Sequence, residues 1–344
     1  MSKLHKVALN GQVFFARSGQ LLLDAALVNG VDIAHDCRAG RCGTCVTRVV
    51  EGITIGGGTP QPGMIHACQA HVLSDLTLAC EPLPPVDVSE GRTVALVDLC
   101  DDVVELTILP ARKSLHLPGQ YYRFTFQGFP ARAFSPTESL DGKWLNKAFK
   151  LNIKRVRDGR VSAQLGTGIL AGHRVRMMGP FGHAFLRPGQ KNRLVLIAGG
   201  TGFAPVWAIA QAALRENPFR PIWLVAGVRR LPQLYMVPAL ELVSRFPNVS
   251  AIATVAATSP APAFVNAGAP ESYLPSLTRE DTVYACGSPA MVGKVAAAAM
   301  ATGATIYSDP FEPAPADNDP LLNRIGSWMR AAVAGPSPVA TRRS

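Results

Sequence analysis

The length of 344 residues predicts two or three domains, and a hydrophobic content of 48% is enough to give each a packed core. The N-terminus lacks the apolar core and cleavage site of a signal peptide, and no apolar run reaches the roughly 18 residues that a membrane-spanning helix needs. The net charge of +10 would suit an anionic partner, but the arginines are scattered and not interleaved with aromatic residues, which argues against nucleic-acid binding. We therefore expect a cytoplasmic monomer with no membrane and no nucleic-acid partner.

The first 86 residues combine strand and helix patterns. Residues 5–16 show the period-two alternation of a hairpin, with Asn10 and Gly11 as its turn. Residues 18–30 show helical periodicity, with Ser18 as the candidate N-cap and Gly30 at the end. Strand-like runs follow at 44–52 and 74–82, and the proline-rich stretch at 81–87 predicts a linker.

Three cysteines lie within nine residues of this region, as Cys37, Cys42 and Cys45 in CRAGRCGTC. Their C-x4-C-x2-C spacing is that of plant-type [2Fe-2S] ferredoxins, and the small residues between them let backbone N–H groups bond to the inorganic sulfides. A zinc site usually needs two C-x2-C pairs, and a Rieske centre needs a C-x-H that is not in the sequence. The spacing therefore predicts a [2Fe-2S] cluster with one ligand still to be found.

Two later cysteines compete as the fourth ligand. Cys80 has the longer gap that is common in plant-type ferredoxins, but it shares one strand face with Leu76 and Leu78, where a free cysteine acts as a small core residue. Cys68 follows a loop and precedes that strand, which is a better place for a ligand that returns to the cluster. We favour Cys68 and keep Cys80 as the alternative.

Two further patterns follow the linker. From Gly91 to about Pro188, short β-rich runs are broken at regular intervals by glycine, proline and aspartate, which predicts a small antiparallel barrel. After Pro188, apolar strands alternate with helical stretches, which predicts a parallel α/β sheet. The chain from Glu312 is rich in proline and alanine. One amphipathic stretch there, which we expect to pack on its own domain or to fray, places four apolar residues on one face: Leu321, Ile325, Trp328 and Ala332.

A glycine-rich turn follows the first strand of the α/β region, in LVLIAGGTGFAPVWAI. Gly200, Thr201 and Gly202 lie between this strand and a helix that we predict to begin at Pro205, a favourable first helical residue. The start of such a helix aims backbone N–H groups at an anion such as a pyrophosphate. The turn is therefore a candidate nucleotide-binding site, although Pro205 replaces the third glycine of the usual dinucleotide motif.

The motif RAFSPT resembles the R-x-Y-S flavin signature of the ferredoxin–NADP reductase superfamily. The resemblance implies that Arg132 pairs with the flavin pyrophosphate, that Phe134 stacks on the isoalloxazine ring and that Ser135 bonds near N5, with Ala133 between them. Phenylalanine in place of tyrosine keeps the stacking and loses a hydroxyl contact to the ribityl chain.

Three more segments match this superfamily in chain order. In RDGRVS, Gly159, Val161 and Ser162 fall in its G-x-x-S segment, which caps the same pyrophosphate. In YACGSP, Cys286 and Gly287 correspond to residues beside the nicotinamide ring. The segment SDPF resembles the C-terminal segment that lies against the flavin and must move aside. It adds Asp309 and Phe311, so that the implied catalytic residues are Ser135, Cys286 and Asp309.

The order of these motifs resembles the reductase component of Rieske non-haem iron ring-hydroxylating oxygenases. In such reductases the fourth cluster ligand lies in an ACQ-like context, which HACQA supplies at Cys68. The implied function is NAD(P)H-dependent transfer of electrons through FAD and the [2Fe-2S] cluster to an oxygenase of aromatic catabolism. A di-iron monooxygenase or a deoxysugar dehydratase is an alternative acceptor, and a redox-sensing module is an alternative of another class.

The predicted domains are a β-grasp-like α+β ferredoxin domain at 1–86, an antiparallel FAD-binding barrel at 87–188, an α/β NAD(P)H-binding domain at 189–315 and a tail at 316–344. The loop after the second strand of the α/β region contains Arg229 and Arg230, which would suit the 2′-phosphate of NADPH. Relatives in the superfamily have at least one arginine here regardless, so we expect NADH as the donor.

Overall fold

The computed structural model describes residues 3–113, 115–142, 148–256 and 262–311. The domain end at 315, the tail and the amphipathic stretch around Trp328 lie outside these residues. None of the helices in the described ranges is long and apolar enough to cross a membrane.

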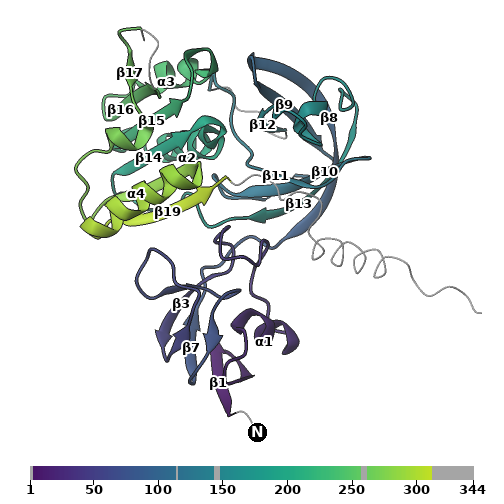
Figure 1. Ribbon diagram of the computed structural model, residues 1–344, viewed down its shortest axis with the longest axis vertical. Coiled ribbons are helices and arrows are strands. Elements are labelled where there is room, and N and C mark those ends of the chain that lie inside the picture. The colour runs from purple at the N-terminus through teal and green to yellow at the C-terminus, as the bar shows by residue number, and fades with distance from the viewer. Residues whose placement is uncertain (1–2, 114, 143–147, 257–261, 312–344) are drawn as a thin grey trace, which may run out of the picture. The chain divides into compact units, whose positions relative to one another are not determined.

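The N-terminal part is a five-stranded sheet with one helix packed against it (Figure 1). The strand order is β2-β1-β7-β3-β5, with β1 antiparallel to β2 and parallel to β7. The helix buries one face against the sheet, as its apolar spacing predicts. The elements are β1 (Leu4–Leu9), β2 (Gln12–Arg17), α1 (Leu22–Val28), β3 (Val46–Glu51), β5 (Met64–His66) and β7 (Leu76–Ala79), with a separate pair formed by β4 (Thr54–Ile55) and β6 (His71–Val72).

In this part of the chain the predicted hairpin turn is confirmed, and the predicted helix N-cap is wrong. Asn10 and Gly11 have φ values of 47° and 87° between β1 and β2, the left-handed conformation that a two-residue hairpin turn requires. Ser18 as N-cap was wrong, because α1 begins at Leu22 after Leu21. The Ser18 N–H instead donates to the Lys3 carbonyl at 2.8 Å and prolongs the hairpin pairing.

The middle part is one six-stranded antiparallel sheet in the order β11-β10-β13-β8-β9-β12. Beyond β11, the Thr137 N–H donates to the Lys150 carbonyl at 2.8 Å, which links the two ends of the sheet and nearly closes a barrel around an aromatic-rich core. The strands are β8 (Asp87–Cys100), β9 (Val103–Pro110), β10 (Tyr121–Phe126), β11 (Arg132–Phe134), β12 (Phe149–Lys154) and β13 (Arg174–Phe181), with a short 3-10 helix η1 (Ser162–Gln164).

The last part is a six-stranded, fully parallel sheet in the order β17-β16-β15-β14-β18-β19. Its strands are buried on both faces: α2 and α3 pack on one face, and α4 packs on the other, beside β18 and β19 (Figure 1). The elements are β14 (Leu194–Gly199), η2 (Gly200–Gly202), α2 (Phe203–Glu216), β15 (Ile222–Val228), η3 (Leu231–Gln233), α3 (Val237–Val243), β16 (Val249–Val255), β17 (Val265–Ala267), η4 (Pro270–Tyr273), β18 (Thr282–Gly287), α4 (Pro289–Thr302) and β19 (Thr305–Pro310).

The predicted start of α2 at Pro205 is two residues late. The glycine turn is itself a 3-10 turn that continues directly into the helix, which therefore begins at Phe203. Pro205 still lies in the first turn, where its missing N–H costs no helical hydrogen bond.

Candidate functional site

The four predicted cluster cysteines lie together as two pairs. The thiol of Cys37 lies beside that of Cys42, and the thiol of Cys45 lies beside that of Cys68. Interaction within each pair lowers the pKa of Cys37 and of Cys68, and together with burial it raises the pKa of Cys42 and of Cys45. Each pair thus favours one thiolate, the form that binds metal.

The donor set is one that a two-iron cluster would take. Two separate pairs of cysteine sulfurs suit a [2Fe-2S] centre, which takes two protein ligands on each iron. The N–H groups of Ala39 and Cys42 lie 3.4 Å from the Cys37 sulfur, as expected of a loop that bonds to cluster sulfurs.

The cysteine loop owes its tight course to two glycines. Gly40 and Gly43 have φ values of 68° and 70°, which other residues rarely adopt. A Cβ at Gly40 would lie 3.0 Å from Cγ of Gln69, and one at Gly43 would lie 2.9 Å from Cβ of His183. The loop is therefore packed closely on both its own domain and the barrel.

Cys80 lies apart from this group. It follows β7, its sulfur is 3.2 Å from Oγ1 of Thr47, and it packs against the core of the N-terminal sheet. Burial raises the pKa of its thiol, which disfavours the thiolate. The choice of Cys68 over Cys80 stays a prediction, and the structure brings only Cys68 next to Cys45.

The predicted flavin residues line the end of the barrel sheet. Arg132, Ala133 and Phe134 form β11, and Ser135 follows it as a buried residue. The Thr137 hydroxyl is buried and has no hydrogen-bond partner among the residues that the structure describes. A polar ligand would supply that partner, so this edge of the barrel fits a flavin nucleotide.

The second predicted flavin segment forms a tight turn at η1. A Cβ at Gly159 would lie 2.5 Å from Oγ of Ser162 and 2.9 Å from the Val156 carbonyl oxygen, so a larger residue would force this turn to shift. Oγ of Ser162 accepts the Val156 N–H at 3.2 Å, and Val161 is buried in the barrel core. The Ser162 hydroxyl proton stays available for a phosphate oxygen.

The glycine turn and the YACGSP motif meet at the switch point of the parallel sheet. From β14 the chain continues outward to β15 on one side and returns to β18 on the other, so the crevice at their carboxyl ends is where such sheets bind ligands. A Cβ at Gly202 would lie 2.1 Å from the Cys286 carbonyl oxygen, and one at Gly287 would lie 3.0 Å from the Gly199 nitrogen. Only glycine permits this close approach of the two backbones.

The SDPF segment extends the same edge. Asp309 in β19 is the register partner of Cys286 in β18, and the Phe311 N–H donates to the Gly287 carbonyl at 2.7 Å. Burial raises the pKa of Asp309 to about 7 and raises the pKa of the Cys286 thiol well above its ordinary value. In both groups burial thus favours the neutral form.

The two predicted arginines lie at the neighbouring strand end. Arg229 and Arg230 directly follow β15 and are both exposed. The Arg230 N–H bonds to Oε1 of Gln233 at 3.1 Å, which fixes the turn into η3. The arrangement leaves both side chains accessible to a ligand in the crevice.

Contacts between the cluster loop and the barrel were missed in the sequence. Asp36 accepts hydrogen bonds from Oη of Tyr121 at 2.6 Å and from Nε of Arg123 at 2.5 Å. The Thr44 hydroxyl accepts the Gly182 N–H at 2.9 Å. The only local signal in the sequence was Asp36, an acidic residue directly before Cys37, and it does not indicate which residues it contacts.

Arg187 was also missed, although it joins all three parts of the described chain. Its guanidinium pairs with Glu81 of the predicted linker at 2.8 Å. It lies 3.8 Å from the ring centre of Phe185 and 3.5 Å from that of Tyr307 in β19. Cation–π contacts with both rings stabilise this largely buried charge.

Comparison with known proteins places these features in a family. Residues 7–80 match the model of a 2Fe-2S iron-sulfur cluster binding domain, and residues 196–297 match that of an oxidoreductase NAD-binding domain. The chain is 32% identical over 297 residues to the ferredoxin–NAD(P)+ reductase component of the naphthalene 1,2-dioxygenase/salicylate 5-hydroxylase systems of a Ralstonia species, which covers 80% of this chain and 88% of that protein. The chain belongs to the family of ferredoxin–NAD(P)+ reductase components.

Two further known proteins match this chain over most of its length. The reductase component of the naphthalene 1,2-dioxygenase system of Pseudomonas putida is 28% identical over 88% of this chain and 97% of its own length. The crystal structure of the Amycolatopsis cytochrome P450 reductase GcoB covers 90% of this chain and 100% of its own, with 29% identity and a TM-score of 0.67. The expected fold class, the oxidoreductase activity and the cofactors [2Fe-2S], FAD and NAD(P)H are confirmed as those of this family.

Proposed function

We propose that the chain takes electrons from NADH and passes them through FAD and a [2Fe-2S] cluster to the terminal oxygenase of an aromatic ring-hydroxylating system. The observation that carries the proposal is the contact of the cysteine loop with the barrel, at Thr44–Gly182 and Asp36–Tyr121, within a chain that also has a nucleotide crevice. When bound, the nicotinamide supplies two electrons together, the flavin separates them and the cluster carries one at a time.

The residues of the barrel and the cysteine loop would hold two of these cofactors. Cys37 and Cys42 would bind one iron, and Cys45 and Cys68 the other. For the flavin, the Arg132 guanidinium would pair with the pyrophosphate, together with the N–H groups and hydroxyl at 159–162. Phe134 would stack on the ring system, and the buried Ser135 hydroxyl would bond at its reactive edge.

The residues at the switch point would hold the nicotinamide nucleotide. The N–H groups at 200–202, at the start of α2, would bind its pyrophosphate. Gly202 and Gly287 leave room for the ring close to the backbone of Cys286. Phe311, held by its bond to Gly287, would cover the flavin and move when the nicotinamide enters.

The domain boundaries remain part of this proposal. We place the ferredoxin domain at 1–86, the FAD-binding barrel at 87–188, the nicotinamide-binding domain at 189–315 and a tail at 316–344. The beginning of β8 at Asp87 and of β14 at Leu194 supports the two inner boundaries. We further propose that the reductase acts as a monomer in the cytoplasm, which size-exclusion chromatography with light scattering would test for oligomeric state.

An absorption spectrum of the purified protein with and without NADH tests the central claim. Flavin and iron–sulfur absorbance should both bleach on anaerobic addition of NADH, and rapid reduction of cytochrome c should follow. Protein that purifies under anaerobic conditions without iron and flavin would contradict the proposal. Cluster and flavin without NADH-dependent reduction would favour the redox-sensing alternative.

The choice of NADH over NADPH is tested by kcat/KM for the two donors. We propose NADH, because relatives in the superfamily have at least one arginine at this place whichever nucleotide they use, so the pair does not by itself indicate NADPH. A higher kcat/KM for NADPH would reverse the choice. In that case the Arg229→Ala and Arg230→Ala variants would show which guanidinium recognises the phosphate.

A second acceptor class has specific support. The GcoB structure, whose match covers 90% of this chain, is that of a cytochrome P450 reductase. The acceptor would then be a haem oxygenase, and a di-iron monooxygenase or a deoxysugar dehydratase are further candidates. Rates of electron transfer to purified Rieske, P450 and di-iron proteins would rank them, and the Rieske protein should be reduced fastest.

A further inference from the structure

The Cys42 sulfur is connected to the barrel through the side chain of Thr44. The Thr44 hydroxyl donates to this sulfur over 3.2 Å, and its oxygen accepts the N–H of Gly182, the residue after β13, over 2.9 Å. Thr44 is 3% exposed. Two consecutive hydrogen bonds thus join the barrel backbone to one predicted iron ligand.

Tyr121, the first residue of β10, reaches the same sulfur from the barrel side. Its hydroxyl donates to Oδ2 of Asp36 at 2.6 Å, and the Cys42 thiol is close enough to help raise the pKa of this phenol. The other oxygen of Asp36 is bound by Nε of Arg123 at 2.5 Å. The single phenolic proton therefore has two acceptors, and Asp36 keeps its arginine partner when the proton turns away.

The other cysteine pair has no such connection in the part of the chain that the structure describes. The Cys68 sulfur is approached by the Gly40 N–H and, at 4.0 Å, by Nε2 of Gln69, and it lies beside that of Cys45. All of these groups belong to the N-terminal sheet domain. The cluster residues are thus asymmetric, with Cys42 as the sulfur that faces the barrel.

We propose that Tyr121 is a positioning residue for electron transfer. Its hydroxyl holds the Cys42 side of the cluster against the barrel. When the cluster is reduced, this hydroxyl turns from Asp36 to the Cys42 sulfur. The inference rests on the proposed function. In the step concerned, a bound reduced flavin would give up one electron, and one ferric iron of a bound cluster would take it up and become ferrous. The cluster gains one negative charge, its sulfurs become better acceptors, and a hydrogen bond to sulfur raises the reduction potential.

The test compares Tyr121→Phe with Tyr122→Phe in the holoenzyme. Both remove one hydroxyl from β10, but the ring of Tyr122 packs in the barrel core against Phe124 and Phe149. Redox titration of the cluster should give a lower reduction potential for Tyr121→Phe than for the wild type. The equilibrium constant for accepting an electron should fall about tenfold, which corresponds to about 59 mV for a one-electron couple. Stopped-flow mixing with NADH should show slower flavin-to-cluster transfer and unchanged reduction of the flavin. Tyr122→Phe should match the wild type in both.

Asp36→Asn should give a shift of opposite sign, and its dependence on the Tyr121 hydroxyl is what a merely structural role would not produce. Weakening the competing acceptor frees the phenolic proton for Cys42 and raises the potential. Because loss of the carboxylate charge raises the potential by itself, Asp36→Asn is also measured in the Tyr121→Phe background, where its effect should shrink. A cluster potential and transfer rate in Tyr121→Phe equal to those of the wild type would overturn the inference. So would an equal effect of Asp36→Asn in both backgrounds.

A third pair of variants covers the case in which Tyr121→Phe does not assemble. Thr44→Val removes the hydroxyl that joins Gly182 to Cys42, and Thr44→Ser keeps it. The potential should fall in the first and be restored in the second, and Asp36→Asn alone should raise it. A potential at or below the wild-type value in Asp36→Asn would then overturn the inference. A wild-type protein with no cluster, or with a flavin that NADH does not reduce, would instead contradict the proposed function.

Discussion

Cys286 and Asp309 are register partners in neighbouring parallel strands, at the carboxyl edge of the sheet where we propose that the nicotinamide binds. Burial raises the pKa of the Cys286 thiol, and it raises the pKa of the Asp309 carboxyl to about 7. We therefore expect this carboxyl to change charge within the physiological range.

Hydride transfer should accordingly become faster as the pH rises through about 7. A hydride that leaves the nicotinamide creates positive charge on the ring, which the Asp309 carboxylate, formed above its pKa, would stabilise. We expect the rate of flavin reduction by NADH to rise about three- to tenfold across this pH. Asp309→Asn should give a flat profile, whereas Asp101→Asn, at an exposed position in the barrel, should keep the wild-type profile. Stopped-flow absorbance measures both, and a sloping profile in Asp309→Asn would refute this role.

Cys68→Ser should lose the cluster, and Cys80→Ser should keep it. The Cys68 thiol lies beside that of Cys45, with no disulfide between them, while the Cys80 sulfur contacts Thr47 and packs in the core. Serine at position 68 removes one of the two sulfurs expected on that iron, whereas at position 80 it costs about 1 kcal/mol of core packing. Iron content and visible absorption of the two purified variants decide between them. The reverse outcome would make Cys80 the fourth ligand.

Gly202→Ala should separate the strands that form the nicotinamide crevice. Its Cβ would lie 2.1 Å from the Cys286 carbonyl oxygen, so the backbones of the turn and of β18 must move apart. We expect flavin reduction by NADH to fall by about tenfold or more, since misplacement of about 1 Å can cost a hundredfold. The control is Gly293→Ala in α4, where a Cβ would meet nothing within 4 Å. That variant should be as active as the wild type and up to about 1 kcal/mol more stable. Equal activity of the two variants would argue against the crevice.

Local patterns predicted those parts of the fold that depend on local interactions. The spacing of Cys37, Cys42 and Cys45 and the turn at Asn10 were readable because the residues concerned are close in sequence. Ser18 was misjudged because its N–H pairs with Lys3, a contact made by the hairpin as a whole. Pro205 was taken as the helix start because the 3-10 turn before it has no distinct sequence signal.

Contacts between domains were beyond the reach of such patterns. Asp36 and Tyr121 are 85 residues apart, and Arg187 and Glu81 are 106 apart. Nothing in the spacing of either residue indicates its partner, because the contact depends on how two separately folded sheets meet. The cofactor motifs were therefore predictable one by one, whereas the hydrogen bonds that join the cysteine loop to the barrel were visible only in three dimensions.

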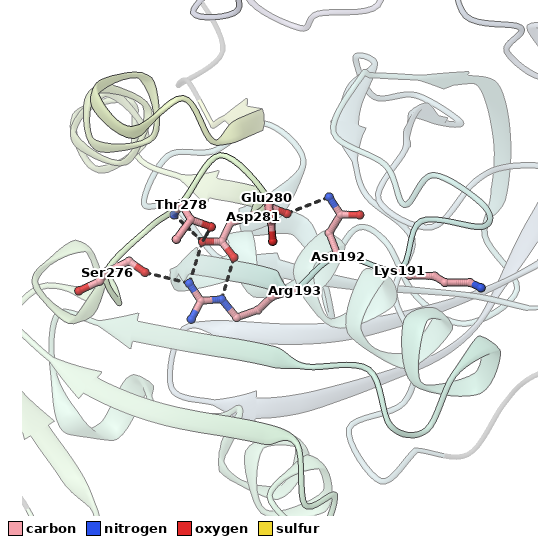
Figure 2. A pocket seen from close by; sticks show the side chains of 7 residues that line it. All are labelled: Lys191, Asn192, Arg193, Ser276, Thr278, Glu280 and Asp281. Carbon is pink, nitrogen blue, oxygen red and sulfur yellow. Dashed lines mark hydrogen bonds and ion pairs between the residues drawn. The ribbon is translucent and has the colours of Figure 1, made fainter.

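The ion pair of Arg193 and Asp281 leads to a prediction about stability. The pKa of Asp281 is lowered, whereas that of Asp309 is raised, so the two carboxyl groups differ in their response to pH. Figure 2 shows the two side chains facing each other at the amino ends of β14 and β18, with Nη2 of Arg193 2.7 Å from Oδ2 of Asp281. The Thr278 N–H donates to the same oxygen at 2.7 Å, and the Asp281 side chain is 4% exposed. Arginine and these hydrogen bonds lower the pKa of Asp281.

Asp281→Asn should therefore lower the free energy of unfolding by about 2 kcal/mol at neutral pH, since it leaves a guanidinium without its buried partner. A lowered carboxyl pKa contributes stability above the unfolded-state pKa of about 4, and that stability is lost only as the pH falls through the folded-state value. The difference between variant and wild type should thus be the same at about pH 5 and about pH 8. Glu280→Gln is the control, because this exposed neighbour accepts the Asn192 hydrogen bond through its backbone carbonyl and not through its side chain (Figure 2). Thermal unfolding at the two pH values measures the effect, and a difference that changes between them would show that Asp281 does not titrate as a paired carboxylate.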